Sequence, residues 1–143
     1  MKGLTAALRD YVTAWSRQSR IVADISLPES CLLPLSIEEA LWRVTQEARS
    51  NVARHSQASS MQLHLGWTEQ DVSLSVSDNG QGFEMTSHEH EGFGLRSIRE
   101  RIKQAGGTLL MQSTKGAGTR IVVHCPLSEQ AMGNAPSENE VTA

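Results

Sequence analysis

The sequence predicts an α+β fold in which one mixed, mostly antiparallel sheet is covered on one face by three helices. Three segments carry apolar residues at helical spacing, and between them lie short segments that alternate apolar and polar residues, as strands do. In the second half these alternating segments are joined by polar turns, so we expect each strand there to pair with its neighbour in sequence. Regular alternation of strand and helix is missing, which disfavours a doubly wound parallel sheet.

The composition indicates one domain and excludes several classes of function. The chain has 143 residues, 38% of them hydrophobic, and a net charge of -3 with scattered Lys and Arg, so we expect no nucleic-acid partner. Cys31 and Cys125 stand far apart without paired Cys or His neighbours, which disfavours a zinc site or a disulfide framework. No apolar run approaches the roughly 20 residues that cross a bilayer, so we expect no membrane contact by this chain.

Helices are predicted at residues 3–18 and 36–55, with a short strand at 20–26 between them. The second helix has the stronger start signal, because Ser36 is followed three residues later by Glu39, which is the pattern of a capping box.

The second half is predicted to hold four strands and one helix. We expect a helix from about residue 95, ended by Gly106 and Gly107. The stretch 80–94 has few apolar residues and is typical of a loop, and residues 128–143 have the composition of a disordered tail. The four strands are expected at residues 61–65, 72–76, 108–113 and 120–125.

One face of the second helix carries Glu47, Asn51 and Arg54, which are spaced four and three residues apart. This face adjoins the apolar stripe, so the three side chains should lie at the edge of the core. An acid, an amide and a guanidinium there would suit a magnesium ion and phosphates. An ordinary salt-bridged helix surface explains the same triplet.

A second candidate site begins with Asp78, directly after a predicted strand. A carboxylate at the end of a strand can accept a hydrogen bond from an exocyclic amine, which would select adenine. Gly80 and Gly82 would let the main chain approach a flat base closely. A plain Asp-Asn-Gly turn is the alternative interpretation.

Two further glycine-bearing segments complete the set. Gly92, Gly94 and Leu95 open the third helix, where main-chain N–H groups can bind phosphate. Gly118 and Thr119 precede the last strand, where a hydroxyl could reach a base or a bridging water, although a hairpin turn accounts for these glycines equally well.

The order and spacing of these four segments resemble a known family. The stretches are EEALWRVTQEARSNVARHSQA, SDNGQGF, GFGLRSIRERIKQAGG and GAGTRIVV. Together they look like the catalytic and ATP-binding domain of a two-component sensor histidine kinase, and more narrowly they are similar to the nitrate-sensor and lipid-desaturation-sensor group. The resemblance runs over residues 36–127 and matches the first helix and strand more loosely.

This resemblance implies a Bergerat-type two-layer sandwich that binds Mg-ATP. Asn51 would hold magnesium, Arg54 would contact phosphate and His55 would lie beside the nucleotide, while Glu47 matches the acid that activates water in related gyrase and mismatch-repair ATPases. Asp78 would read adenine, and residues 83–91 would form a short ATP lid. The glycine boxes and their neighbours would be Gly80, Gly82, Gly92, Gly94, Leu95, Arg96, Gly118 and Thr119.

The resemblance also implies a partner. The γ-phosphoryl group would pass to a histidine on a separate helical dimerisation domain, and a response regulator would act after it. No helix carrying such a histidine precedes residue 36, and the two histidines that are followed by an acid, His88 and His90, lie in the lid stretch, so we expect this chain not to phosphorylate itself. Two alternatives remain, namely a free-standing serine kinase of the anti-sigma-factor type and a catalytically silent nucleotide-binding module.

We therefore expect residues 1–35 to be the lead-in helix and first strand, 36–127 the core of the ATP-binding domain, and 128–143 a tail. The resemblance implies a cytoplasmic location, with the parent protein anchored in the inner membrane.

Overall fold

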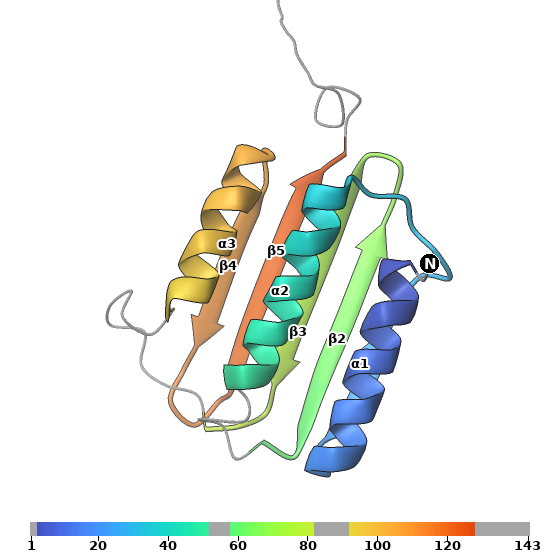
Figure 1. The fold of residues 1–143 in the computed structure, drawn as a ribbon. Coiled ribbons are helices and arrows are strands. Elements are labelled where there is room, and N and C mark those ends of the chain that lie inside the picture. The colour runs from blue at the N-terminus through green and yellow to red at the C-terminus, as the bar shows by residue number, and fades with distance from the viewer. Residues whose placement is uncertain (1–2, 52–57, 82–91, 128–143) are drawn as a thin grey trace, which may run out of the picture.

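The computed structural model describes residues 3–51, 58–81 and 92–127 (Figure 1). Its elements in chain order are α1 (Leu4–Ser19), β1 (Val22–Ser26), α2 (Leu35–Asn51), β2 (Ser60–Trp67), β3 (Asp71–Asp78), α3 (Gly92–Gln104), β4 (Thr108–Ser113) and β5 (Thr119–Pro126).

The five strands form one sheet in the order β1-β2-β3-β5-β4. β1 runs parallel to β2, and every other neighbouring pair is antiparallel. The three helices lie side by side over one face of this sheet, with α2 between α1 and α3 (Figure 1). The predicted fold class, an α+β sandwich with a mixed, mostly antiparallel sheet under three helices, is confirmed.

The core lies between the helices and this covered face. Along β2, β3 and β5 every second side chain is buried, because successive residues of a strand point to opposite faces. Leu8, Leu41 and Val44 are fully buried and cover the strands from α1 and α2. α1 and β1 thus belong to the same core as the rest of the chain.

The two neighbouring helices α1 and α2 are joined by an aromatic and cationic contact. A guanidinium N–H of Arg49 donates to the Tyr11 hydroxyl at 2.9 Å, and the guanidinium carbon lies 5.3 Å from the centre of the Tyr11 ring. The Trp42 ring centre is 4.9 Å from that of Tyr11. Tyr11 on α1 is thus in contact with the middle of α2 through Trp42 and with its last turns through Arg49.

The start of α2 corrects one prediction. The N–H groups of Ile37 and Glu38 both donate to the Pro34 carbonyl at 3.0 Å, so the helix begins at Leu35. Ser36 therefore lies inside the first turn and is not the capping residue. The spacing of Ser36 and Glu39 matches a capping box, but the Pro34 carbonyl accepts the first bonds of the helix two residues earlier.

A second correction concerns strand order. β4 follows β3 in sequence, but β5 is the strand that pairs with β3, and β4 lies at the edge. The two predicted hairpins, β2–β3 and β4–β5, are confirmed, but the expectation that pairing is local throughout this half is wrong, because β3 also pairs with β5. β5, with the buried Ile121, Val123 and Cys125, thereby takes a central position. Leu110 on β4 is 53% exposed, as an edge strand allows.

The end of α3 is as predicted. Gly106 has a φ of +84°, and its N–H and that of Gly107 donate to the carbonyls of Lys103 and Ile102 at 2.9 Å. These bonds satisfy the last carbonyls of the helix. Among the described residues no helix is long and apolar enough to cross a membrane.

Candidate functional site

The four segments singled out from the sequence meet at one end of the molecule. α2 and β3 end there, and α3 and β5 begin there, as the lower part of Figure 1 shows. The directions of these elements thus bring Asn51, Asp78, Gly92 and Thr119 to the same end of the sheet, which we call the Asp78 edge, although they come from four separate parts of the sequence.

Asp78 is the last residue of β3 and is half-buried. Its side chain is on the covered face, in the same row as Leu74 and Val76, so the carboxylate faces the helix layer. The N–H of Gly80 donates to its Oδ1 at 2.8 Å, and the N–H of Thr119 also donates to the carboxylate. A carboxylate has about four acceptor positions, so capacity remains for an outside donor.

The electrostatics of Asp78 reflect this position. Burial raises the pKa of the carboxyl above its usual value of 3.8, while the N–H groups of Gly80 and Thr119 act in the opposite direction. A partly desolvated carboxylate that is still open to a donor is suited to hold a polar N–H of a ligand.

Gly118 and Thr119 lie directly against Asp78. Asp78 and Thr119 are partners in the β3–β5 register. Gly118 has a φ of +85°, and a Cβ on it would overlap the carbonyl oxygen of Asp78 and lie 3.3 Å from the Cα of Asn79. The close approach of these two backbones therefore requires glycine at position 118.

A cavity of about 270 Å³ lies at this end of the sheet. Its lining combines Asp78 and Thr119 with Ser77 and Arg120 from the opposite face, so it opens around the end of the strands. Pockets for whole ligands are about 300 to 1,000 Å³, so this cavity is just below the size that holds a complete small-molecule ligand. The remaining lining residues are Gln112, Ser113, Thr114, Ala117 and Gly118.

The predicted phosphate end of the site is described in part. Glu47 is partly exposed on α2, and Asn51 is the last residue of that helix. Arg54, His55 and Gly82 lie outside the described residues, as does the predicted lid at 83–91.

The predicted helix start at the second glycine box is confirmed. Gly92 is the first residue of α3, Gly94 and Leu95 lie in its first turn, and Arg96 is exposed. The first N–H groups of a helix have no partner within it and attract anions. The start of α3 lies at the same end of the molecule as the end of β3 (Figure 1).

Several residues at this end were not predicted from the sequence. Asn79 bonds to Ser59 and Ser60, Ser113 donates its hydroxyl to the Gly118 carbonyl at 3.2 Å, and the N–H of Gly116 donates to the Gln81 carbonyl. The Ser113 and Thr119 hydroxyls are also 2.9 Å apart. The contacts of Asn79 and Gly116 join segments that are distant in sequence, and those of Ser113 depend on the exact register of the β4–β5 hairpin. An Asn next to the end of a strand was the only sign of them in the sequence.

No group of three or more His, Cys, Asp or Glu side chains that could hold a metal ion occurs within residues 3–51, 58–81 and 92–127. A purely protein-made metal cage is therefore missing from that part. Magnesium keeps several waters and is often bound through one or two side chains together with phosphates, so such a cage is not required for it.

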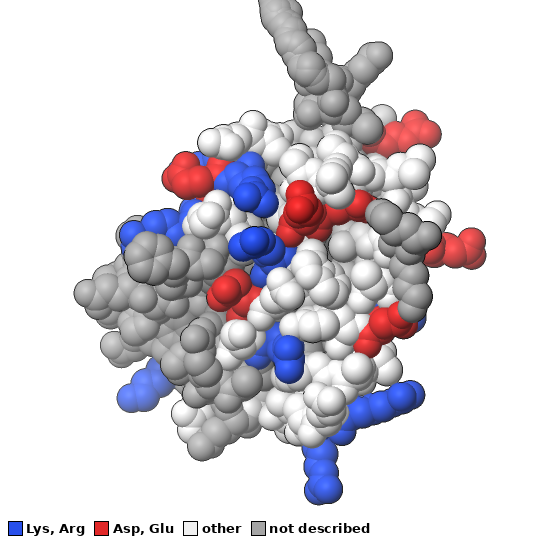
Figure 2. Space-filling view, viewed as in Figure 1, with Lys and Arg blue, Asp and Glu red and all other residues white. Residues whose placement is uncertain are grey.

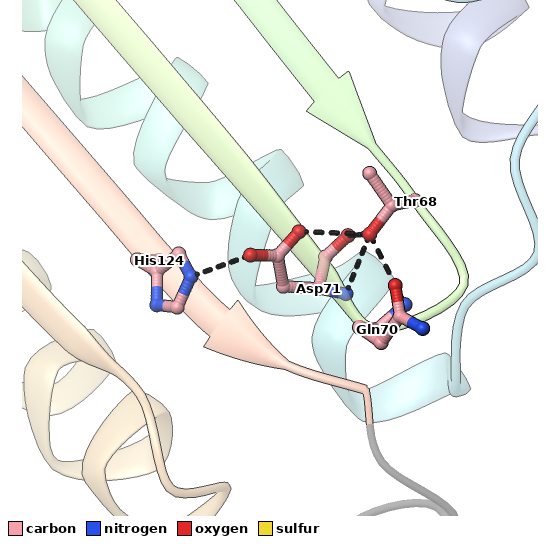
Figure 3. Close-up of polar contacts among 4 residues, drawn as sticks. All are labelled: Thr68, Gln70, Asp71 and His124. Carbon is pink, nitrogen blue, oxygen red and sulfur yellow. Dashed lines mark hydrogen bonds and ion pairs between the residues drawn. The ribbon is translucent and has the colours of Figure 1, made fainter.

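The other polar cluster lies at the opposite end of the sheet (Figure 3). The Asp71 carboxylate is 3.0 Å from the His124 ring, and the Thr68 hydroxyl bonds to the same carboxylate at 3.0 Å and accepts the N–H groups of Gln70 and Asp71 at 3.1 Å. His124 and Asp71 are both about half exposed, so this pair lies at the surface of the sheet. On the face in Figure 2, acidic and basic side chains of the described residues are interspersed, with no continuous basic surface.

Comparison with known proteins agrees with this geometry. Residues 36–129 match the family model described as "Histidine kinase-, DNA gyrase B-, and HSP90-like ATPase". The chain is 31% identical over 140 residues to the sensor histidine kinase LiaS of Bacillus subtilis, covering 98% of this chain and 39% of LiaS. It is 37% identical over 131 residues to the sensor protein VraS of Staphylococcus aureus, covering 90% of this chain and 37% of VraS. The chain thus spans less than two fifths of the length of these relatives.

Solved structures show the same fold. The histidine kinase domain of a blue-light activated histidine kinase from Erythrobacter litoralis superposes with a TM-score of 0.73 at 19% identity, over 90% of this chain and 63% of that one. The histidine kinase AdeS of Acinetobacter baumannii gives a TM-score of 0.66 at 16% identity, over 88% of this chain and 64% of that one. The matched segment contains the Asp78 edge, the end of α2 and the start of α3, and by this match the chain belongs to the ATPase-domain family of histidine kinases, DNA gyrase B and HSP90.

Proposed function

We propose that the chain binds Mg-ATP at the edge that carries Asp78 and donates the γ-phosphoryl group to a histidine on a separate helical dimerisation domain. The observation that carries the proposal is the environment of Asp78. The carboxylate is half-buried on the covered face, held by the N–H groups of Gly80 and Thr119, and retains acceptor capacity for an amine. Adenine offers such an amine.

The phosphates would extend from this point toward the ends of two helices. Asn51 would bind magnesium, with Arg54 on a phosphate and His55 beside the nucleotide. Gly80 and Gly82 would pass close to the base and sugar. Mg²⁺ bound there would neutralise charge that develops on the transferred phosphoryl group.

The start of α3 would meet the triphosphate from the other side. Gly92, Gly94 and Leu95 would offer main-chain N–H groups, and the exposed Arg96 would add a positive charge nearby. Glu47, part way along the same face of α2 as Asn51, would be a catalytic acid that matches the water-activating acid of related ATPases. Phosphoryl transfer needs mainly positioning and charge neutralisation, which these groups supply without a covalent intermediate on the chain.

The acceptor and the cognate response regulator would belong to the longer parent protein and its pathway. The named relatives are sensor proteins more than twice as long as this chain, which supports a role as one part of such a kinase. We propose the same division as above, with residues 36–127 as the core and 1–35 as its lead-in, and a cytoplasmic location on a membrane-anchored parent.

Calorimetry tests the binding step. Titration of the chain with Mg-ATP should give saturable binding below millimolar nucleotide, and the Asp78→Asn variant should lose most of it. A wild-type chain that does not bind at millimolar Mg-ATP would overturn the proposal.

The chemical step is tested with radiolabelled ATP and the complete parent kinase. Label on histidine is acid-labile and alkali-stable, whereas label on serine resists acid, so the stability of the product separates the histidine kinase from the serine kinase alternative. Binding without any transfer would favour the catalytically silent module.

A further inference from the structure

Asn79, directly after Asp78, uses its whole side chain to bind the start of β2. Its Oδ1 accepts the N–H groups of Ser59 and Ser60, each at 3.0 Å, and its Nδ2 donates to the Ser59 hydroxyl at 3.0 Å. The main-chain N–H of Asn79 donates to the Ser60 carbonyl at 3.3 Å. Four hydrogen bonds thus connect one residue to two.

This contact joins three strands at one point. The Ser59 carbonyl accepts the N–H of Val22 at 3.0 Å, so β1, β2 and the end of β3 are linked through the same short segment. On the β5 side, Gly118 is packed against the carbonyl of Asp78 and the Cα of Asn79. The peptide that follows Asp78 is therefore held from both neighbouring strands.

The bonds are not needed to turn the β2–β3 hairpin. That turn lies at the other end of the two strands, where Thr68 and Asp71 stabilise it. Strand ends far from a turn fray most readily, because the last ladder bonds have no neighbour beyond them. Asn79 adds hydrogen bonds beyond the end of the β2–β3 ladder, directly beside the Asp78 carboxylate.

We propose that Asn79 is a positioning residue for nucleotide binding, which holds Asp78 where its carboxylate selects the amine of adenine. The inference rests on the proposed function and adds how its selectivity is maintained. The hydrogen bond from the adenine amine to the Asp78 carboxylate would weaken if the carboxylate moved by about 1 Å, since hydrogen bonds weaken steeply with distance and angle.

Base selectivity gives a readout that a purely structural role would not move. Inosine triphosphate differs from ATP in carrying a carbonyl oxygen in place of the amine, so it offers Asp78 no such donor. Calorimetry with each nucleotide and magnesium gives the ATP-to-ITP affinity ratio. In Asn79→Ala the ATP affinity should fall about tenfold, or about 1.4 kcal/mol, with ITP affinity nearly unchanged.

Two variants bracket this result. Asn79→Asp keeps an acceptor for both Ser59 and Ser60 N–H groups and should retain most of the preference for ATP. Thr68→Ala is the matched control, because Thr68 also bonds two main-chain N–H groups of the same hairpin but at its far end. It should lower the thermal midpoint of unfolding and leave the ATP-to-ITP ratio as in the wild type.

If Asn79→Ala lowers the thermal midpoint as Thr68→Ala does and keeps the wild-type ratio, the residue is structural only and the inference fails. Should Asn79→Ala not fold, Asn79→Ser decides in its place. Its single hydroxyl is too short to hold both N–H groups, so a wild-type ratio in that variant also overturns the inference. Failure of the wild-type chain to bind ATP, by contrast, overturns the proposed function itself.

Discussion

Gly118 lies against the main chain of Asp78 so closely that any Cβ at position 118 would overlap the Asp78 carbonyl oxygen. The contact joins the end of the β4–β5 turn to the end of β3, and the atoms that an added Cβ would meet belong to the backbone of Asp78 and Asn79. Neither side can rotate away as a side chain would, so the substitution of Gly118 has to move a strand.

The first prediction compares two glycines of the β4–β5 turn. Gly118 and Gly116 have nearly equal φ values, +85° and +87°, but an added Cβ at Gly116 meets nothing within 4 Å. Gly116→Ala should therefore cost only the left-handed strain, about 1 to 2 kcal/mol. Gly118→Ala should cost about 1 to 3 kcal/mol more through overpacking and should also weaken ATP binding. Urea unfolding measures the loss of stability in the two variants. Equal losses would show that the close approach of Gly118 to Asp78 does not matter.

The second prediction is that Asp78→Asn separates stability from binding. Because burial raises the folded-state pKa of Asp78, its stabilising contribution is present below the unfolded value near 3.8 and is lost as pH rises through the folded value. At pH 7 the neutral amide avoids the cost of burying a charge. The variant should unfold at a urea concentration no lower than the wild type.

ATP affinity of the same variant should fall by roughly 10- to 100-fold, since hydrogen bonds to charged groups contribute about 1.5 to 3 kcal/mol. The control is Asp24→Asn, which changes an exposed carboxylate on β1, two strands from β3 and on the opposite face of the sheet from Asp78, and should leave ATP affinity unchanged. Wild-type affinity in Asp78→Asn would rule out an adenine-reading carboxylate.

The third prediction concerns magnesium. In Asn51→Ala, ATP affinity should become nearly independent of magnesium, because the ion would lose its protein ligand and keep only phosphate and water. Calorimetry in magnesium and in EDTA measures the difference. Ser50→Ala, at the exposed neighbouring position of α2, is the matched control. An unchanged magnesium response in Asn51→Ala would move the metal site elsewhere.

The fourth prediction concerns Asp71 and pH. Hydrogen bonds from His124 and then Thr68 lower the pKa of Asp71 below its usual 3.8. The stabilisation is therefore present above pH 3.8 and is lost as pH falls through the folded value. Asp71→Asn should make the unfolding midpoint less dependent on pH below about 4 while ATP affinity stays as in the wild type. An unaltered acid profile would mean that the contact contributes nothing.

The sequence predicted those parts of the fold that depend on local patterns. The strand at residues 108–113 was predicted with its observed bounds, because it lies between the two glycines that end α3 and a glycine-bearing turn. The glycine stop after α3 was also found, since Gly106 needs a left-handed φ there. Both signals are complete within a few residues of the chain.

Long-range choices were harder to predict. β5 lies between β3 and β4 and pairs with both of them. Which strand takes this position depends on the packing of the whole sheet, and no local sequence pattern specifies it. The start of α2 shifted because the carbonyl of Pro34 begins the helix before Ser36. At the candidate site, Asp78 and Gly118 were predicted individually, but the role of Asn79 depends on Ser59, which no local pattern connects to it.

The central position of β5 also determines when, during folding, the site can first exist. The β2–β3 and β4–β5 hairpins close short loops and can form early and independently. Asp78 and Thr119 meet only when the two hairpins dock, which requires closure of the long loop that contains α3. A chain arrested after β4 would contain Asp78 but would lack the strand that completes its surroundings. A nucleotide that binds only the finished sheet would stabilise this last docking step by mass action and so report that folding is complete.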